Sequence, residues 1–308
     1  MALTDRRIAV TGAAGFVGGW LMSHLAEVGA EPVSFFEPGQ YALGDPAQIG
    51  DILDRLKPDV VVHLAAIAAP GEAQDNPRSA FDVNLGGTLN LAEAIIARGG
   101  HTRLLFAGSS EVYGHSFNLS DAPLGEDARL EPQTLYGVTK ASADLLLGQM
   151  ASGGLDVVRF RPFNHTGPGQ TEAYVVPAFA RQIARIEAGL QEPIIEVGDL
   201  NAERDFLDVR DVVRAYGLAA LRPEPLSPGT VLNLASGQPR KIEAILRHML
   251  ALSTVAIEVR VDPARVRPAS TPRAVGDAAK ARASIDWTPV IPFEQTLEDV
   301  LNSWRSLM

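Results

Sequence analysis

Two patterns of apolar residues alternate along the first half of the chain. Short, nearly continuous apolar runs predict strands that are buried on both faces of a sheet. Between these runs apolar residues recur every three or four positions, which predicts helices with one buried face. The predicted strands lie at 8–10, 32–36, 60–66, 103–107 and 156–160, and the predicted helices begin at 16, 46, 77 and 134. This alternation predicts an α/β fold with a doubly wound parallel sheet.

The second half of the chain follows a less regular pattern. Helical spacing recurs at 173–190, 241–251 and 294–306, and a short strand is predicted at 193–197. The apolar run at 231–235 predicts a strand that rejoins the large sheet, so a second domain is expected to be interleaved with the first. We therefore predict a doubly wound domain from 1–165 with 207–235, and a smaller α/β domain from 166–206 with 236–308.

Three glycines stand where the first predicted strand gives way to a helix. Gly12, Gly15 and Gly18 have the spacing GxxGxxG, and Phe16 and Val17 begin the helix. Without a Cβ at the glycines, a pyrophosphate can approach the free backbone N–H groups at the positive end of the helix. A strand before and a helix after the glycines support a dinucleotide site of the Rossmann kind. The alternative is a plain glycine turn between two packed elements.

Two other strand ends carry candidate cofactor residues. Glu37 follows the second strand, 19 residues after Gly18, where a carboxylate can accept hydrogen bonds from the adenosine ribose and repel a 2′-phosphate. This favours NAD(H), with NADP(H) as the alternative if Glu37 is instead a solvated turn residue. At the end of the third strand, Leu64, Ala65 and Ala66 are expected to let the backbone approach the cofactor.

Four further polar residues call for a structural interpretation first. His63 is expected to be a packed histidine at a strand end, without a chemical role. Asn84 lies among apolar residues of the helix predicted at 77–98, so its buried amide needs partners and is either a structural tie or a cofactor contact. Asp208 and Asp211 are three residues apart, which is typical of a helix N-cap and its reciprocal partner.

Side chains suited to catalysis follow the fourth strand and open the next helix. Ser109, Ser110 and Glu111 lie at the edge of a parallel sheet where ligands bind. Tyr136 and Lys140 are four residues apart and share one helix face. Because a free phenol has a pKa of ~10, a neighbouring ammonium is expected to lower the Tyr136 pKa and make the phenol useful for proton transfer.

Composition limits the partners of the chain. With 27 Lys and Arg against 37 Asp and Glu, its formal charge is -10, which disfavours non-specific binding to nucleic acid or an anionic membrane. There is no cysteine, no basic-then-apolar leader and no apolar run near ~18 residues. We therefore expect a cytoplasmic protein with no membrane segment, and we predict no metal site.

In such an acidic chain, phosphate groups of a ligand must be bound by specific arginines. Arg204 and Arg267 are the leading candidates for binding a diphosphate. Arg265 and Arg273 belong to the same group, but each is more typical of a solvated surface arginine.

Taken together, the motifs resemble those of the extended short-chain dehydrogenase/reductases that act on nucleotide sugars. Thr11 before the glycines, with Ser109, Tyr136 and Lys140, carries this resemblance, which extends over nearly the whole chain. Within that group the chain is similar to the GDP-4-keto-6-deoxy-D-mannose reductases in the stretches GSSEVYG, LYGVTKAS, RPFNHTGPGQ, QEPIIEVGDL, RDFLDVRDVVRAY and VRPASTP.

The resemblance implies roles for the matching residues. Ser109, Tyr136 and Lys140 match the catalytic triad, and Asn84 matches the cofactor-side asparagine. The expected substrate residues are Ser110, Glu111, Asn164, Arg204 and Arg267, of which the last three match the family's nucleotide-diphosphate contacts. The implied protein is a homodimer that reduces the 4-keto group of a GDP-linked 6-deoxyhexose with a nicotinamide cofactor, giving GDP-D-rhamnose.

Two positions depart from the reductases, and one residue supports an alternative. Glu37 stands where the reductases frequently have a basic residue. Ser270 stands two residues after the Arg267-Pro268 pair, where they usually have an acidic residue. Glu111 matches a glutamate that related dehydratases use to eliminate water, so a nucleotide-sugar 4,6-dehydratase or 4-epimerase is the main alternative. A non-catalytic dinucleotide sensor is a remote one, because such proteins usually lose the triad.

Overall fold

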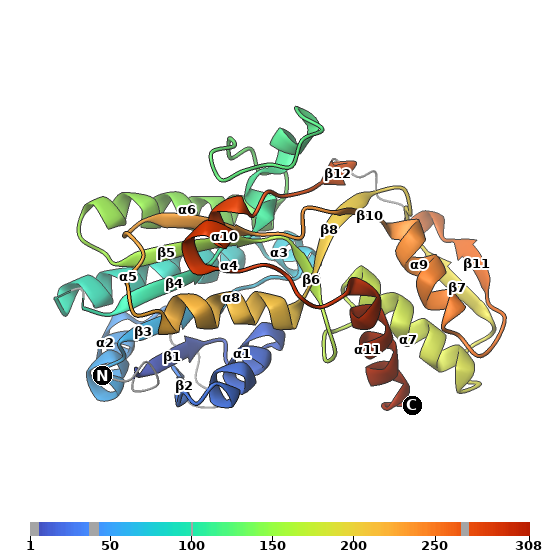
Figure 1. Ribbon diagram of the computed structural model, residues 1–308, viewed down its shortest axis with the longest axis horizontal. Helices are drawn as coiled ribbons and strands as arrows, with labels where there is room; N and C mark the ends of the chain where they lie inside the picture. Colours follow the sequence, from blue (N-terminus) through green and yellow to red (C-terminus); the bar gives the residue numbers. More distant parts are fainter. Residues whose placement is uncertain (1–5, 37–42, 100, 266–270) are drawn as a thin grey trace.

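The computed structural model describes residues 6–36, 43–99, 101–265 and 271–308. Its large sheet has six parallel strands in the order β2-β1-β3-β4-β5-β9. The strands are β1 (Ile8–Thr11), β2 (Pro32–Ser34), β3 (Val60–His63), β4 (Arg103–Ala107), β5 (Val157–Pro162) and β9 (Thr230–Leu234). The predicted parallel sheet is confirmed, and so is the late strand that rejoins it (Figure 1).

Helices cover both faces of this sheet because its strands are apolar on both sides. Ile8 and Val10 belong to the core under one face and Ala9 to the core under the other, and all three are fully buried. One face packs against α1 (Phe16–Glu27), α8 (Val209–Leu221) and α10 (Ala279–Ile285), and the other against α2 (Pro46–Leu56), α5 (Gly87–Ala97) and α6 (Leu135–Ser152). The sheet and these helices form the larger lobe of the molecule.

The order of the strands creates a switch point between β1 and β3. After β1 the chain moves outward to β2 and then returns to the other side of β1 as β3. In open sheets of this kind, ligands bind in the crevice beyond the carboxyl ends of the strands at that point. The glycine turn after β1 and the residues after β3 therefore meet where a cofactor is expected.

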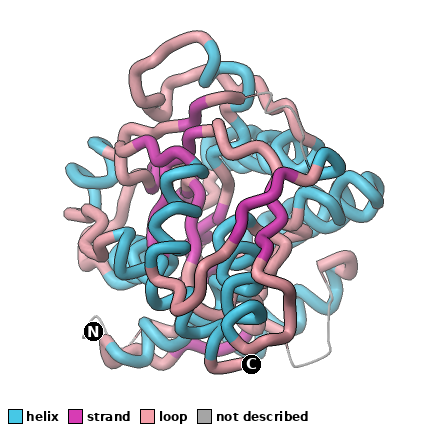
Figure 2. The backbone as a smooth tube through the Cα atoms, turned by 90° about the vertical axis from the view of Figure 1, so that its right-hand side faces the viewer, coloured by secondary structure: helices cyan, strands magenta, loops and turns pink. Residues whose placement is uncertain are grey.

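The smaller lobe is built from short strands and three helices. One sheet contains β6 (Asn164–Thr166), β8 (Glu203–Asp208), β10 (Pro239–Lys241) and β12 (Arg273–Ala274), and a second contains β7 (Ile194–Val197) and β11 (Glu258–Val261). Around them lie α7 (Val175–Glu187), α9 (Ile242–Ala251) and α11 (Phe293–Arg305), whose apolar sides share a separate core. Figure 2 looks onto this lobe and shows its strands bordered by helices. The boundaries between the two predicted domains stay a prediction.

Several elements differ from those predicted. The helix expected at 77–98 is interrupted, since α4 (Pro77–Phe81) is followed by a π-helical turn at Asp82–Gly86 before α5 begins. Such a turn inserts one extra residue into a helix and changes which side chains face inward. The additional short elements are α3 (Pro70–Asp75) and 3₁₀ turns at Ser110–Val112, Gly114–Asn118 and Pro263–Arg265. The strand at β11 was not predicted, because its four exposed residues include two charged ones and lack an apolar run.

Candidate active site

The glycine turn follows β1 directly and opens α1. Gly12 has a φ of +71°, a left-handed conformation that glycine adopts without strain. A Cβ on Gly18 would lie 2.0 Å from the carbonyl oxygen of Gly12, so the absence of a Cβ lets α1 pack closely against the turn. The ligand clearance predicted for Gly18 stays a prediction. Gly15 is the N-cap of α1, and no side chain caps this helix. The first N–H groups, at Phe16 and Val17, are therefore suited to bind a pyrophosphate.

Thr11 joins the glycine turn to the end of β3 across the switch point. Its Oγ1 accepts hydrogen bonds from the N–H groups of Leu64 (3.1 Å) and Ala65 (3.2 Å). A Cβ on Gly12 would lie 2.9 Å from the nitrogen of Ala65, so the two backbones approach closely. Leu64, Ala65 and the half-buried Ala66 thus flank the turn, but two of their N–H groups bind Thr11.

Asn84 occupies a buried position behind this turn. Its Oδ1 accepts a hydrogen bond from the N–H of Ile67 (2.8 Å), and its Nδ2 donates to the carbonyl of Ile67 (3.0 Å) and to Thr139 Oγ1 (3.0 Å). The side chain is 1% exposed and both amide protons have acceptors. The structure therefore favours the structural tie over the cofactor contact. Glu37, the predicted ribose contact, lies outside the described residues.

Ser109, Tyr136 and Lys140 converge at the carboxyl end of β4. Ser109 follows β4 and is buried, and its Oγ accepts a hydrogen bond from the N–H of Glu111 (3.1 Å). Ser109 also lies near enough to the Tyr136 phenol to lower its pKa. Lys140 lies one turn further along α6, and its Nζ donates to the carbonyl oxygen of Ala107 (2.8 Å). The three residues predicted for catalysis are therefore adjacent, while their catalytic roles stay a prediction.

Burial shifts the pKa values of both titratable members of this trio. Lys140 is 3% exposed, and its Nζ lies 5.0 Å from the centre of the Phe106 ring; this burial lowers the pKa of Lys140 to about 8. Burial also raises the pKa of the Tyr136 phenol, with further increases from Tyr174 and Glu111 and an opposing effect from the nearby Ser109 side chain. The expected lowering of the Tyr136 pKa is therefore wrong for this structure, and the phenol keeps its proton at neutral pH.

A cavity of about 560 Å³ has walls from both lobes and is lined by Ser110, the neighbour of Ser109, although the three residues of the trio do not themselves line it. Its polar lining includes Ser110 and Glu111 after β4, Asn164 in β6, Tyr174 before α7 and Arg204 in β8. Four of the five predicted substrate residues are thus brought together from distant parts of the chain. The fifth, Arg267, lies outside the described residues, as does Ser270.

Arg204 is the one cationic side chain among the lining residues that the structure describes. Burial lowers the pKa of Arg204, whereas the nearby carboxylates of Glu111 and Asp199 raise it. Its Nη1 donates to the carbonyl oxygens of Glu203 (2.8 Å) and Pro272 (3.4 Å). Within the described part of the chain, all its hydrogen bonds leave from Nη1, so Nε and Nη2 are available for the oxygens of a diphosphate.

Arg273, another candidate arginine, does not line this cavity. Arg273 donates from Nη1 to the carbonyl of Asp121 (2.5 Å), and its Nε lies 3.4 Å from a carboxylate oxygen of Glu203. It therefore ties β12 to the loop after β4. The side chain of Arg265 lies outside the described part of the molecule.

Sequence reasoning missed two side chains of the site. Tyr174 lines the cavity directly before the amphipathic helix α7, a place that carries no chemical signal in the sequence. Thr134 was expected to open α6, and its Oγ1 accepts from the N–H of Gly137 (2.9 Å). The same hydroxyl donates to Glu111 Oε2 (3.1 Å), a contact that the sequence did not indicate.

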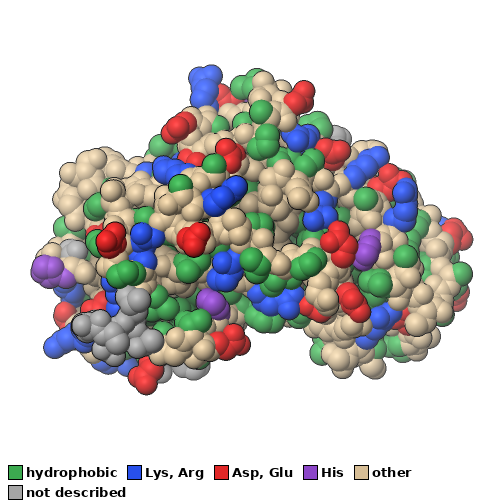
Figure 3. All heavy atoms as spheres, viewed as in Figure 1, with side chains coloured by type: hydrophobic (Ala, Val, Ile, Leu, Met, Phe, Trp, Pro, Cys, Tyr) green, Lys and Arg blue, Asp and Glu red, His purple; other side chains and the backbone are tan. Residues whose placement is uncertain are grey.

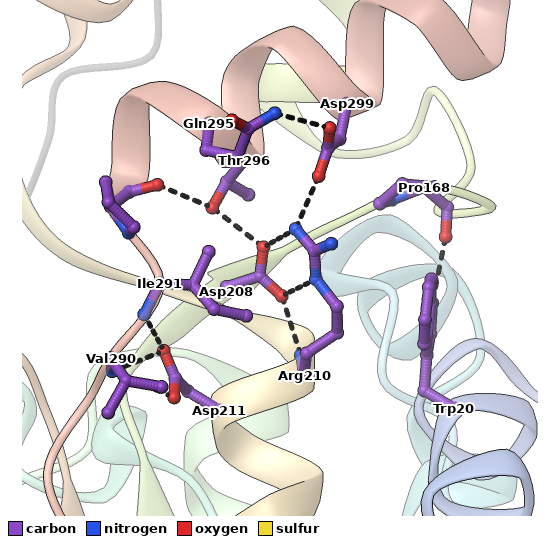
Figure 4. A network of polar contacts seen from close by, with 11 residues as sticks. Trp20, Pro168, Asp208, Arg210, Asp211, Val290, Ile291, Gln295, Thr296 and Asp299 are labelled. Atoms are coloured by element: carbon purple, nitrogen blue, oxygen red, sulfur yellow. Dashed lines mark hydrogen bonds and ion pairs between the residues drawn. The ribbon is translucent and has the colours of Figure 1, made fainter.

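A network of charged residues joins the two lobes (Figure 4). Asp208 caps α8 as predicted, accepting from the N–H of Arg210 (2.7 Å), and it also accepts from Thr296 Oγ1 (2.7 Å) in α11. Arg210 bridges Asp208 Oδ2 (2.7 Å) to Asp299 Oδ2 (2.6 Å). The role of reciprocal partner predicted for Asp211 is wrong, because its carboxylate accepts from two backbone N–H groups of the loop before α11. That loop has no strand partner there, and Asp211 satisfies its donors.

Comparison with known proteins identifies the family to which this arrangement belongs. The model of the family described as GDP-mannose 4,6 dehydratase matches residues 9–300. The chain belongs to this family. This family member is 38% identical over 302 residues to the GDP-6-deoxy-D-mannose reductase of Pseudomonas aeruginosa, and the match covers 98% of each protein.

Two further comparisons show which other proteins the chain is similar to. The structure of RMD from Pseudomonas aeruginosa complexed with NADPH is similar with a TM-score of 0.90 and 36% identity, over 99% of this chain and 100% of that one. The UDP-glucose 4-epimerase of Streptomyces lividans is 29% identical, over 91% of this chain and 90% of that protein. The predicted fold class and the predicted enzyme group are confirmed.

Two observations concern the predicted partners of the chain. Figure 3 shows acidic and basic side chains interspersed over the visible face. Among the helices of the described ranges, none has both the length and the apolar character needed to cross a bilayer.

Proposed function

We propose that the chain is a nucleotide-sugar reductase that transfers a hydride from a nicotinamide cofactor to the 4-keto group of GDP-4-keto-6-deoxy-D-mannose, forming GDP-D-rhamnose. The observation that carries this proposal is the similarity to a GDP-6-deoxy-D-mannose reductase over 98% of both proteins. The adjacency of Ser109, Tyr136 and Lys140 beside one cavity supports it.

The residues of the trio suit the proton side of this reaction. The chemistry that a bound nicotinamide supplies is the hydride. As carbon 4 becomes tetrahedral, its oxygen gains negative charge and needs a proton and a hydrogen bond. Tyr136 keeps its proton at neutral pH and is the donor, while Ser109 donates a hydrogen bond to the same oxygen. The Lys140 ammonium stabilises the phenolate that remains. On the basis of the family resemblance, we propose that Lys140 also binds the nicotinamide ribose.

The cavity residues suit the charged part of the substrate. Arg204 offers Nε and Nη2 to the diphosphate, and a forked guanidinium matches phosphate oxygens better than an ammonium does. Asn164 and Ser110 line the same cavity and can bind oxygens of the nucleotide or the sugar. We propose the same diphosphate role for Arg267 on the basis of the family resemblance.

The cofactor is proposed to be NAD(H) in preference to NADP(H). The proposal depends on Glu37, since a carboxylate near the ribose repels a 2′-phosphate by on the order of 1–2 kcal/mol, or about tenfold in affinity. Among the similar solved structures, RMD holds NADPH, whereas several others, including UDP-glucose 4-epimerases, hold NAD. Fluorescence titration of the protein with NADH and NADPH checks the preference, and tighter binding of NADPH contradicts it.

The organisation of the molecule is proposed from the same reasoning. Residues 1–165 with 207–235 bind the cofactor, and residues 166–206 with 236–308 complete the sugar-nucleotide site. The resemblance supports a cytoplasmic homodimer, which analytical ultracentrifugation tests.

The deciding experiment supplies freshly prepared GDP-4-keto-6-deoxy-D-mannose with NADH or NADPH and follows the absorbance of the reduced nicotinamide. We expect one cofactor to be oxidised for each GDP-D-rhamnose formed, with the product identified by NMR. A protein that leaves both unchanged contradicts the proposal.

A 4,6-dehydratase is the second candidate, because Glu111 lies in the cavity. Reduction needs no base at this position, so Glu111→Gln is expected to change turnover little. Near-complete loss of activity in Glu111→Gln, with elimination of water from a GDP- or UDP-hexose by the parent protein, would instead establish the dehydratase.

A further inference from the structure

A series of buried hydrogen bonds begins at the end of β1, next to the glycine turn, and continues through the end of β3. Thr11 Oγ1 lies 2.7 Å from His63 Nδ1, and His63 Nε2 lies 3.0 Å from Thr88 Oγ1. Thr11 is fully buried, and His63 and Thr88 are each 1% exposed. These contacts join β1, β3 and α5, which are neighbours only in the folded protein.

In this series of hydrogen bonds each group donates to the next one, in the order Thr11, His63, Thr88. Thr88 Oγ1 donates to the carbonyl oxygen of Asn84 (2.6 Å), so it must accept from His63 Nε2. Thr11 Oγ1 accepts from two backbone N–H groups, so its own proton goes to His63 Nδ1. These contacts assign His63 as the neutral tautomer with the proton on Nε2. Burial, and then the charge of Lys140, lower the pKa of His63 to about 3, which agrees with this assignment.

The chain of contacts continues to the catalytic helix. The π-helical turn places Asn84 against α6, where its Nδ2 donates to Thr139 Oγ1 (3.0 Å). Thr139 Oγ1 in turn donates to the carbonyl oxygen of Tyr136 (2.8 Å). The series of contacts therefore starts beside Gly12 and ends on the backbone of the proposed proton donor.

We propose that His63 is a positioning residue that, through Thr11, Thr88 and Asn84, fixes the glycine turn relative to the first turn of α6 and so aligns the cofactor with Tyr136. A leucine of similar size would fill the space but leave the hydroxyl proton of Thr11 without its acceptor. A cationic side chain would be repelled by the ammonium of Lys140. A neutral ring with one donor and one acceptor meets both requirements. The rate readouts below rest on the proposed function, whereas the cofactor-binding readout does not.

The test compares His63→Leu, which removes both hydrogen bonds, with His63→Gln, which keeps a donor and an acceptor. Val300→Ala serves as the matched control, because Val300 is buried in the separate core of the smaller lobe. For each variant we measure the melting temperature, the Kd of the reduced cofactor by fluorescence, kcat and KM for the sugar nucleotide, and the isotope effect on kcat with cofactor deuterated at carbon 4.

Misalignment predicts a specific set of changes. In His63→Leu, kcat falls and the cofactor Kd rises by about 10- to 100-fold each, since small displacements of reacting groups slow catalysis by such factors. The isotope effect rises, because hydride transfer becomes slower than the other steps, and KM for the sugar nucleotide stays within about twofold of the parent. His63→Gln recovers most of the loss, and Val300→Ala lowers only the melting temperature.

A different set of results would contradict the positioning role of His63. If His63→Leu loses as much thermal stability as Val300→Ala but keeps the parental cofactor Kd and kcat, His63 is only a packed strand-end residue and the proposal fails. If His63→Leu does not fold, Thr88→Val and Thr88→Ser form the test, and equal cofactor Kd values in these two variants overturn it. A parent protein that reduces no sugar nucleotide contradicts the proposed function, while the cofactor Kd values still decide the role of His63.

Discussion

The proposed cofactor half of the site is made of backbone, whereas the proposed substrate half is made of side chains. On one side, a single stretch from Gly12 to Gly18 supplies bare N–H groups and positions where no Cβ fits. On the other side, Glu111, Asn164 and Arg204 reach one cavity from three separate elements. The first half is therefore fixed by close packing, while the second can change by one substitution without disturbing the fold. This difference explains how one fold can keep its cofactor and act on several sugar nucleotides.

The largest expected effect comes from the residue at which the two halves meet. Tyr136→Phe removes only the hydroxyl, so the fold and the affinity for both ligands are expected to survive while kcat falls by about 10²- to 10⁴-fold. Stopped-flow measurement of cofactor oxidation with saturating substrate checks this. A variant that keeps a tenth or more of the parental kcat would show that another group donates the proton.

A single added methyl group in the glycine turn is expected to disrupt the backbone half of the site. In Gly18→Ala the new Cβ would lie 2.0 Å from the carbonyl oxygen of Gly12 and 2.8 Å from the Cα of Ala13, and backbone atoms cannot rotate away. We expect the free energy of unfolding to fall by about 3 kcal/mol, the upper part of the range for overpacking, and cofactor binding to be lost. Gly19→Ala is the control, since a Cβ there has no atom within 4 Å. Chemical denaturation and cofactor titration of both variants provide the measurement, and equal behaviour of the two would contradict the packing role.

The side-chain half responds differently, because binding there depends on individual charges. Arg204→Ala is expected to weaken binding of the sugar nucleotide by about 1.5–3 kcal/mol, the cost of a lost charge-assisted hydrogen bond, with cofactor affinity nearly unchanged. Arg204→Lys should recover part of the loss, since it restores the charge without the fork. Isothermal titration with GDP checks both variants. An equal loss of affinity for both ligands would indicate damage to the fold.

The smallest effect concerns the pH range in which the two halves work together. The pKa of Lys140 is about 8, below its usual 10.5, so its charged form is present below pH 8 and is lost as the pH rises through that value. If the ammonium is needed for turnover, kcat should fall about tenfold between pH 7 and pH 9. Over the same range the unfolded chain holds the Lys140 proton more tightly, so this group makes the fold more stable as the pH rises. The opposite signs separate loss of activity from unfolding, and a kcat that stays constant to pH 9.5 would contradict the role of Lys140.

The parts of the molecule that could be predicted are those whose residues are near one another in the sequence. The glycine turn, the buried strands and the Tyr136–Lys140 pair depend on local spacing, and the structure contains all of them. Asn164 carried no signal of its own and came from the family resemblance, whereas Arg204 was already a leading candidate for a diphosphate contact in an acidic chain. The packing role of Gly18 was not predicted, because only the folded turn shows how near the Gly12 carbonyl lies.

Burial accounts for most of the remaining differences. Spacing showed that Lys140 is close to Tyr136, but not that desolvation has the largest effect on both groups, and so the predicted direction of the phenol pKa shift was wrong. His63 lies within an apolar strand, and its partners Thr11 and Thr88 come from two other elements. The π-helical turn at Asp82–Gly86 has no sequence pattern that distinguishes it from an ordinary helix.

The return of the chain to the large sheet has a consequence for its synthesis. A ribosome completes β5 long before it makes β9, the strand that pairs with β5 at the edge of the sheet. Until then the nascent chain presents an open strand edge, and the helix α10, which covers part of one face of the sheet, is also missing. Exposed edges and apolar faces are the surfaces that chaperones bind and that aggregate when left free. A chain stopped before Thr230 is therefore expected to be retained by chaperones or to precipitate, and not to accumulate as an independent cofactor-binding fragment.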